Sequence, residues 1–236
     1  MSAWSSPLAI LGFGFVLGLR HALDVDHLAA VSTIVSRQRS VWRSSLVGVA
    51  WGVGHTTSLL AVAIAVIALH AEIVPWVEQC LELGVALMLI WLGARLLYGV
   101  IRGDALHAHA HAHAGRPHVH PHWHREGAAV HEHGPSHRRP FAIGLVHGLA
   151  GSGGLMLAVA ATIPDPLLAI GYVMIFGLGS IGGMALMSAL FAIPSLMTTH
   201  RFAGVERWLR AGAAVASVTV GVALAWEIGR AAGLLA

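Results

Sequence analysis

Long apolar segments alternate with short polar connections along the whole chain. Crossing the hydrocarbon core of a bilayer, about 30 Å thick, takes roughly 20 apolar residues in a helix. Segments of that length cover residues 7–35, 45–69, 77–101, 141–163, 167–193 and 211–232. They lack the alternation of lipid-facing and lumen-facing positions that marks the strands of a membrane barrel. The pattern therefore predicts an all-α integral membrane protein with six transmembrane helices.

The composition agrees with a bilayer environment. Of 236 residues, 56% are hydrophobic and 11% are charged, and the mean hydropathy is +0.73. The formal net charge is +3, but the basic residues lie singly between apolar segments, so we expect lipid and not nucleic acid around the protein. A single cysteine excludes an internal disulfide and a cysteine-rich metal site, which leaves imidazole and carboxylate as strong ligands.

The arginines predict the orientation in the membrane. The first, third and fifth connections contain Arg, whereas the second (residues 70–76) and the fourth (164–166) contain no Lys or Arg. Cytoplasmic connections carry the excess of positive charge. We therefore expect a multi-pass protein of the plasma (inner) membrane, with the odd connections in the cytoplasm and both termini outside.

Three short motifs recur in the same order. GLRHAL (residues 18–23) returns as GLVHGL (144–149), WGVGHTT from Trp51 returns as FGLGSIG from Phe176, and VEQCLELG (77–84) returns as VERWLRAG (205–212). Each half holds three spans, so the second copy enters the membrane from the opposite side. This predicts two inverted three-helix repeats, residues 1–103 and 140–236, a common plan of transporters that alternate access around a central site.

Between the repeats, residues 104–139 form a histidine-rich cytoplasmic loop. Eleven histidines fall between His107 and His137, with Gly, Pro and Arg and almost no large apolar side chains. Such a segment cannot bury a core, so we expect disorder. It either binds several cations weakly, in order to buffer, deliver or sense them, or is a tolerated low-complexity linker.

The first apolar segment contains the polar motif HALDVDH. On a continuous helix, at about 100° per residue, His21, Asp24 and His27 share one stripe and Asp26 lies opposite, turning inward only if the helix unwinds. Each ionisable group within a span costs ~2.5–3.5 kcal/mol. Imidazole with carboxylate suits Ni, Co, Zn or Fe. The structural alternative is an Arg20–Asp24 ion pair at the i, i+4 spacing.

Two further histidines are candidate ligands. His55 lies within the second apolar segment, where it either supplies another nitrogen or makes a polar contact between helices. His147 aligns with His21 in the repeat. The second copy has no counterpart of the acids or of His27, because its aligned residues are Ala150, Ser152 and Gly153. We therefore expect an asymmetric metal site built mainly by the first half.

Two enzymatic functions are alternatives to transport. Ser152 in HGLAGSGG suggests an intramembrane serine-type hydrolase as one alternative. The G-x-S-x-G motif of such enzymes has a glycine two places before the serine, and this chain lacks it. The other is an intramembrane metalloenzyme that uses the same His and Asp groups. The chain has no G-K-[ST], so it does not hydrolyse ATP by a P-loop. We favour a transporter over an enzyme.

These motifs resemble the nickel/cobalt transporter superfamily. Its signature H-A-x-D-A-D-H reads HALDVDH here, with Val25 at the second alanine, and its G-H-[ST] motif reads GHTT from Gly54 to Thr57. The resemblance implies that His21, Asp24, Asp26, His27 and His55 handle metal. Over nearly its whole length the chain is more similar to the compact six-helix urease-accessory branch than to the larger permeases of the superfamily.

That branch is thought to supply nickel for enzymes such as urease. The resemblance therefore implies Ni²⁺, or Co²⁺, as a transported ion rather than a prosthetic group. It also implies a cytoplasmic metallochaperone or nickel-enzyme maturation system as partner. The histidine-rich loop is similar to that of efflux permeases of the same superfamily, so import and export both remain open.

Overall fold

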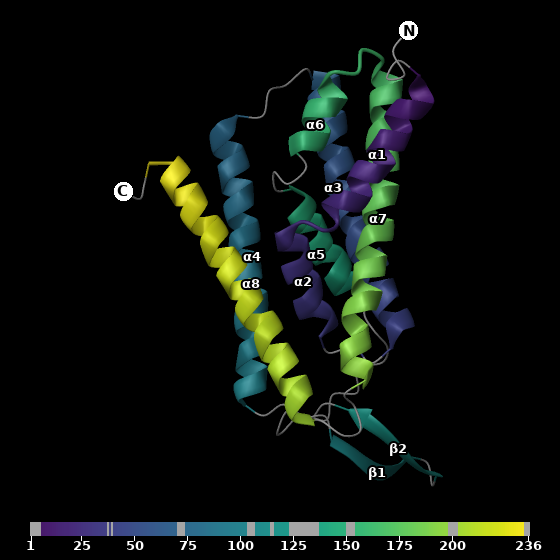
Figure 1. Ribbon diagram of the computed structural model, residues 1–236, viewed down its shortest axis with the longest axis vertical. Helices are drawn as coiled ribbons and strands as arrows, with labels where there is room; N and C mark the ends of the chain where they lie inside the picture. Colours follow the sequence, from purple (N-terminus) through teal and green to yellow (C-terminus); the bar gives the residue numbers. More distant parts are fainter. Residues whose placement is uncertain are drawn as a thin grey trace.

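The computed structural model describes residues 6–36, 38, 40–69, 74–102, 107–113, 116–122, 137–149, 154–197 and 203–233. Its elements, in chain order, are α1 (Pro7–His21), α2 (Val25–Val35), α3 (Val41–Leu69), α4 (Pro75–Ile101), β1 (His107–His113), β2 (Arg116–His122), α5 (Arg138–Leu149), α6 (Gly154–Ala161), α7 (Pro166–Met197) and α8 (Ala203–Ala231). The helices form one elongated bundle (Figure 1).

Four of these helices are long and apolar enough to cross a membrane: α3, α4, α7 and α8. Two shorter pairs reach that length only together, because α1 and α2 meet at a 57° bend and α5 and α6 meet at a 58° bend. The described chain thus offers four candidate spans, or up to six if each bent pair is one span. This agrees with the all-α membrane class that the sequence predicts. Most helix bounds lie within about four residues of the predicted ones, but α8 begins at Ala203, eight residues before the predicted start at residue 211.

The two bent pairs lie on either side of a central pair of long helices. Helix α3 packs against α5 and α7, α1 packs against α7, and α2 contacts α7 and α8, while α4 runs along α8 (Figure 1). Helices α1 and α5 run in opposite directions, and so do α3 and α7 (Figure 1). Both bends therefore lie near the middle of the bundle.

Closely matched glycine contacts join the two halves. A Cβ on any of six glycines would come too close to a backbone carbonyl oxygen of the facing helix. The pairs are Gly18 with Phe176 and Gly144 with Trp51, Gly54 with Phe141 and Gly179 with Phe15, and Gly93 with Ala214 and Gly221 with Ala86. Each contact has a counterpart at the aligned position of the other half. Small residues thus let the helix backbones approach, as in membrane bundles generally.

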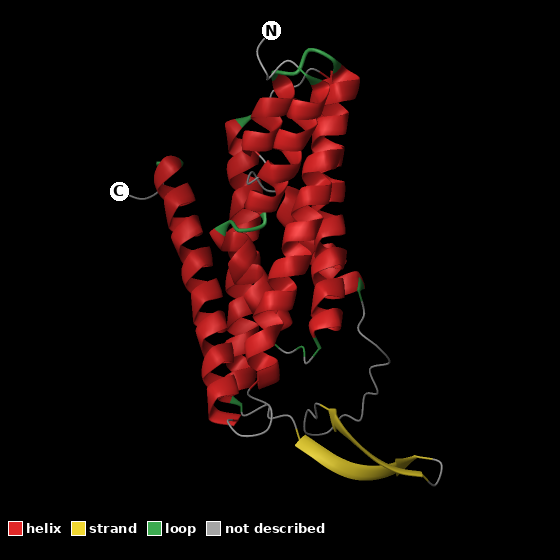
Figure 2. Ribbon diagram, turned by 45° about the vertical axis from the view of Figure 1, so that its right-hand side comes forward, coloured by secondary structure: helices red, strands yellow, loops and turns green. Residues whose placement is uncertain are grey.

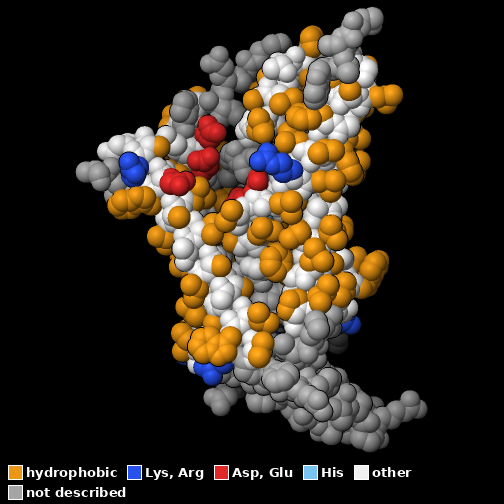
Figure 3. Space-filling model, in the orientation of Figure 1, with side chains coloured by type: hydrophobic (Ala, Val, Ile, Leu, Met, Phe, Trp, Pro, Cys, Tyr) orange, Lys and Arg blue, Asp and Glu red, His pale blue; other side chains and the backbone are white. Residues whose placement is uncertain are grey.

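The outer surface suits lipid. Large apolar side chains such as Leu8, Trp42 and Trp208 are largely exposed, whereas Trp51, Tyr172 and Phe176 are buried in the bundle. On the face drawn in Figure 3, hydrophobic side chains cover most of the surface. Acidic and basic side chains gather there around a hollow in the upper half (Figure 3).

The histidine-rich segment contains a hairpin where the composition predicted disorder. Strands β1 and β2 pair antiparallel, with His107 opposite His122 and His113 opposite Arg116. The hairpin lies at the end of the bundle opposite the N-terminus (Figure 2). Alternation of His and Ala has the two-residue period of a strand, which the composition argument did not use. Residues 123–136 lie outside the described chain, and the predicted division at 104–139 stays a prediction.

Candidate metal centre

The polar motif of the first half lies at the bend between α1 and α2. Helix α1 ends at His21, and Asp24, with φ −61° and ψ 147°, is the extended residue that precedes α2. The prediction of a single stripe on a continuous helix is therefore wrong. Asp24 makes no side-chain cap to α2. Its carboxylate instead accepts a hydrogen bond from Nδ1 of His21, at 2.9 Å.

The bend also turns Asp26 into the bundle. Its Oδ1 accepts from Nδ1 of His27 at 3.2 Å, and its Oδ2 accepts from Nε2 of His147 at 2.9 Å. The expectation that Asp26 lies opposite the histidines holds only for an unbroken helix. Restarting the helix after Asp24 gives Asp26 a first-turn position that faces α5, so one carboxylate joins the two halves.

Four imidazoles form the centre of the cluster. His21, His27, His55 and His147 come from α1, α2, α3 and α5, and all four side chains are buried. Ring centroids lie 4.3 Å apart for His27 and His147, 4.4 Å for His21 and His27, and 5.0 Å for His27 and His55. Nε2 of His21 lies 3.1 Å from Nε2 of His55. His27 is therefore the central member.

Two overlapping groups have the spacing of a metal site. In the first, His21, His27 and His55 each offer a nitrogen, and these atoms lie within 4.8 Å of one another. In the second, Asp26, His27 and His147 do the same with an oxygen and two nitrogens. His27 belongs to both. Nitrogen-rich donor sets of this kind suit late first-row transition metals and disfavour Mg²⁺ and Ca²⁺.

Comparison with known proteins shows the family of this chain. The chain is 32% identical over 194 residues to the urease accessory protein UreH of Bacillus sp. (strain TB-90). The aligned region covers 82% of this chain and 81% of that protein. The chain belongs to the UreH family. The resemblance to the urease-accessory branch is thus confirmed. No protein-family model and no solved structure matches this UreH-family chain.

Two aromatic residues enclose the cluster in this UreH-family protein. The Trp51 ring lies 5.5 Å from both His27 and His147, and the Phe176 ring lies 5.3 Å from His21. Our sequence reasoning did not assign them a place at the site. The signal was present, because Trp51 and Phe176 align with each other in the repeat, one residue before a glycine in each half.

Asp24 is the most accessible of the ionisable residues of the motif. Its side chain is 47% exposed, against 19% for Asp26. With Arg20, His21 and Phe176 it lines a cavity of about 170 Å³ beside the start of α6. This cavity reaches the imidazole cluster at His21.

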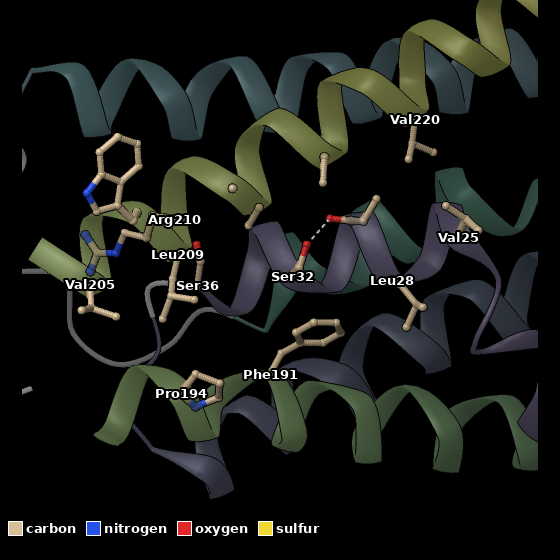
Figure 4. A pocket seen from close by; sticks show the side chains of 15 residues that line it. Val25, Leu28, Ser32, Ser36, Phe191, Pro194, Val205, Leu209, Arg210 and Val220 are labelled. Carbon is tan, nitrogen blue, oxygen red and sulfur yellow. Dashed lines mark hydrogen bonds between the residues drawn. The ribbon is translucent and has the colours of Figure 1, made fainter. Parts of the chain in front are cut away.

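A larger cavity lies elsewhere. It is an open pocket of about 580 Å³ between α2, α7 and α8, lined by apolar side chains such as Leu28, Phe191 and Val220 (Figure 4). Its lining includes Arg210 but no His, Asp or Glu. A divalent cation finds no ligand there, so size does not identify the metal centre.

Proposed function

We propose that this protein transports divalent transition-metal cations across the membrane, nickel by preference and cobalt as the alternative. The observation that carries the proposal is the meeting of four buried imidazoles from four helices, two of which are hydrogen-bonded to the carboxylate of Asp26. Ionisable groups inside a membrane bundle are costly, and they mark pathways for ions and substrates. Packing of the helices alone would not require four buried imidazoles and a carboxylate at one place.

The arrangement meets both demands of transport. A divalent ion must exchange water for protein ligands that bind firmly enough for it to enter and loosely enough for it to leave. Buried imidazoles supply the ligands, and the cavity at Asp24 supplies access. The name of the UreH relative connects that protein with urease. We extend this to nickel for the present chain, with a cytoplasmic metallochaperone or nickel-enzyme maturation system as partner.

We further propose six spans in two inverted repeats, with each bent pair crossing as one broken span. The opposed directions of α1 and α5 and the matched glycine contacts support this plan. It puts the cluster near the bilayer midplane, where such transporters bind their substrate. The arginine distribution supports a plasma-membrane protein with its histidine-rich loop in the cytoplasm and both termini outside.

The test is the flux of radiolabelled nickel into sealed vesicles that contain the purified protein in known orientation. We expect saturable flux that protein-free vesicles lack, with cobalt competing and magnesium not competing. Sidedness of the flux decides between import and export. Absence of any nickel flux or nickel binding would contradict the proposal and favour an intramembrane enzyme.

A further inference from the structure

The two aspartates of the motif do not have to touch the ion. We propose that the four imidazoles are the ligands of the transported cation, and that Asp24 and Asp26 are positioning residues that hold three of them in the required tautomer and orientation. This inference rests on the proposed transport function, and it deepens that function by separating ligands from supports. It follows from where each proton must lie in the hydrogen bonds of the cluster.

The bond between His21 and Asp24 fixes the first tautomer. An ionised carboxylate only accepts hydrogen bonds, so the Nδ1 of His21 that faces it must carry the proton. The lone pair of His21 is therefore on Nε2, the atom that points at His55. A carboxylate behind a metal-binding imidazole is a common arrangement, and it makes the imidazole a better ligand.

Asp26 fixes two more imidazoles in the same way. Its oxygens accept from Nδ1 of His27 and from Nε2 of His147, so these nitrogens carry protons. The lone pairs then lie on Nε2 of His27 and Nδ1 of His147. Both atoms are buried, and neither has a hydrogen-bond partner within the described chain. A buried acceptor without a partner is costly, and a bound cation would satisfy it.

His55 differs from the other three because no carboxylate contacts it in the described chain. Since His21 offers only a lone pair at Nε2, the 3.1 Å contact requires that His55 donate its Nε2 proton. Two nitrogens at right angles, each about 2.0–2.1 Å from one ion, lie roughly 3 Å apart. The ion can therefore take the place of that proton, and His55 is the ligand that must change its tautomer on loading.

This division of roles has a consequence for selectivity. Neutral imidazole ligands favour nickel or cobalt over Mg²⁺ and Ca²⁺, which prefer oxygen. Two carboxylates one hydrogen bond away balance the positive charge of the ion without binding it directly. The ion is thus held by neutral imidazole ligands, which water can replace when the ion leaves. This suits a site that must release the ion it transports.

Substitution of Asp24 separates the two roles. Asn keeps an oxygen that accepts from Nδ1 of His21, whereas Ala removes the acceptor. For nickel transport we expect Asp24→Ala to lose about 10- to 100-fold and Asp24→Asn to lose less than about tenfold. Asp165 is the matched control, because its exposed carboxylate accepts from the backbone of Leu167 and lies outside the cluster. Asp165→Asn should transport as wild type does.

Asp26 gives a second, independent test. It accepts two hydrogen bonds, and Asn has one acceptor oxygen, so in Asp26→Asn one of the two imidazoles must take the wrong tautomer. We therefore expect the loss in Asp26→Asn to exceed the loss in Asp24→Asn. Equal losses for Asp24→Asn and Asp24→Ala, each at wild-type amounts in the membrane, would overturn the inference, because they would mean that the carboxylate itself binds the ion.

X-ray absorption at the nickel edge reads the ligands directly and does not depend on any of these variants folding. The sample is the full chain with the histidines between residues 107 and 137 changed to alanine, so that the loop adds no signal. We expect scattering from four imidazoles and no carboxylate oxygen. A carboxylate in the shell would overturn the inference while leaving transport in place. Failure to bind or transport nickel at all would instead overturn the proposed function.

Discussion

The two bent helix pairs have nearly the same bend angle and very different chemistry. Helices α1 and α2 meet at 57°, and α5 and α6 meet at 58°. In each pair the last turn of the first helix holds a buried histidine, His21 or His147, three residues after a glycine that contacts the facing helix. Only the first bend adds two acids and a further histidine. Packing thus demands symmetry of the glycines, whereas the site needs only one set of ionisable groups.

The second half of the chain supplies a histidine to the site but no acid. His147 donates a hydrogen bond to Asp26 of the first half, and the segment between His147 and α6 contains no ionisable residue. Placing two more acids there would add charge inside the bundle without a cation to balance it. A single set of acids therefore costs less free energy of charge burial than a set in each half, although the helices around the site are arranged symmetrically.

The strongest challenge to this comparison is to remove one histidine from each half. His27→Asn keeps a donor to Asp26 but lacks the second nitrogen, and we expect a loss of nickel flux of roughly 100-fold or more, beyond what loss of a supporting hydrogen bond costs. His147→Asn should lose less, because the ring of His27 lies 4.3–5.0 Å from all three other imidazoles, whereas that of His147 is 5.8 Å from His55. The exposed His137 is the control for substitution. A larger loss from His147→Asn would reverse the assigned asymmetry.

Removal of the acids sharpens the asymmetry within the first half. Asp26→Ala leaves two buried imidazoles without their partner, whereas Asp24→Ala leaves one. We expect nickel affinity to fall about 100-fold in Asp26→Ala and about tenfold in Asp24→Ala. Nickel titration of each purified variant, with its loop histidines replaced, measures both. The comparison fails if Asp24→Ala is the more damaging change.

The glycines test the symmetric part of the comparison. Gly18→Ala and Gly144→Ala should each destabilise the protein by about 1–3 kcal/mol, because each new methyl group overlaps a facing carbonyl oxygen. Gly84 and Gly212 are matched controls, since nothing lies within 4 Å of a Cβ at either position. Changing them to Ala should have no effect or stabilise by up to ~1 kcal/mol. Thermal unfolding in detergent measures all four, and unequal costs at Gly18 and Gly144 would argue against matched halves.

The smallest effect is expected in the histidine-rich loop. Changing all eleven histidines between residues 107 and 137 to alanine should leave the initial rate of nickel flux within about threefold of wild type, because the cluster lies within the helices. Retention of nickel by the protein should fall. Complete loss of flux would place the loop in the transport route and would show that the two bends alone do not define it.

Hydropathy predicted the helices well because lipid imposes a simple rule on length and polarity. It located every long helix and placed His21, His27, His55 and His147 within apolar segments. It missed the direction of Asp26, since that direction depends on a break that occupies three residues between α1 and α2. Gly18 permits close packing of the helix, but it does not predict the residue at which the helix ends.

Other features of the site depend on distant contacts. The bond between Asp26 and His147 joins residues 121 positions apart, and the approach of Trp51 to both His27 and His147 depends on how α3 and α5 pack. The periodicity of apolar residues and the amino-acid composition do not predict such long-range contacts. The recurrence of GLRHAL as GLVHGL pointed to His147, because it aligned His147 with His21.

The most direct test of the account is to locate nickel in the protein by anomalous scattering at the nickel absorption edge. The account predicts a single strong peak among His21, His27, His55 and His147, about 2.0–2.1 Å from the imidazole nitrogens that bind the ion. A protein that transports nickel but shows its peak elsewhere, with these four imidazoles bonded only to their carboxylates and to one another, would contradict it.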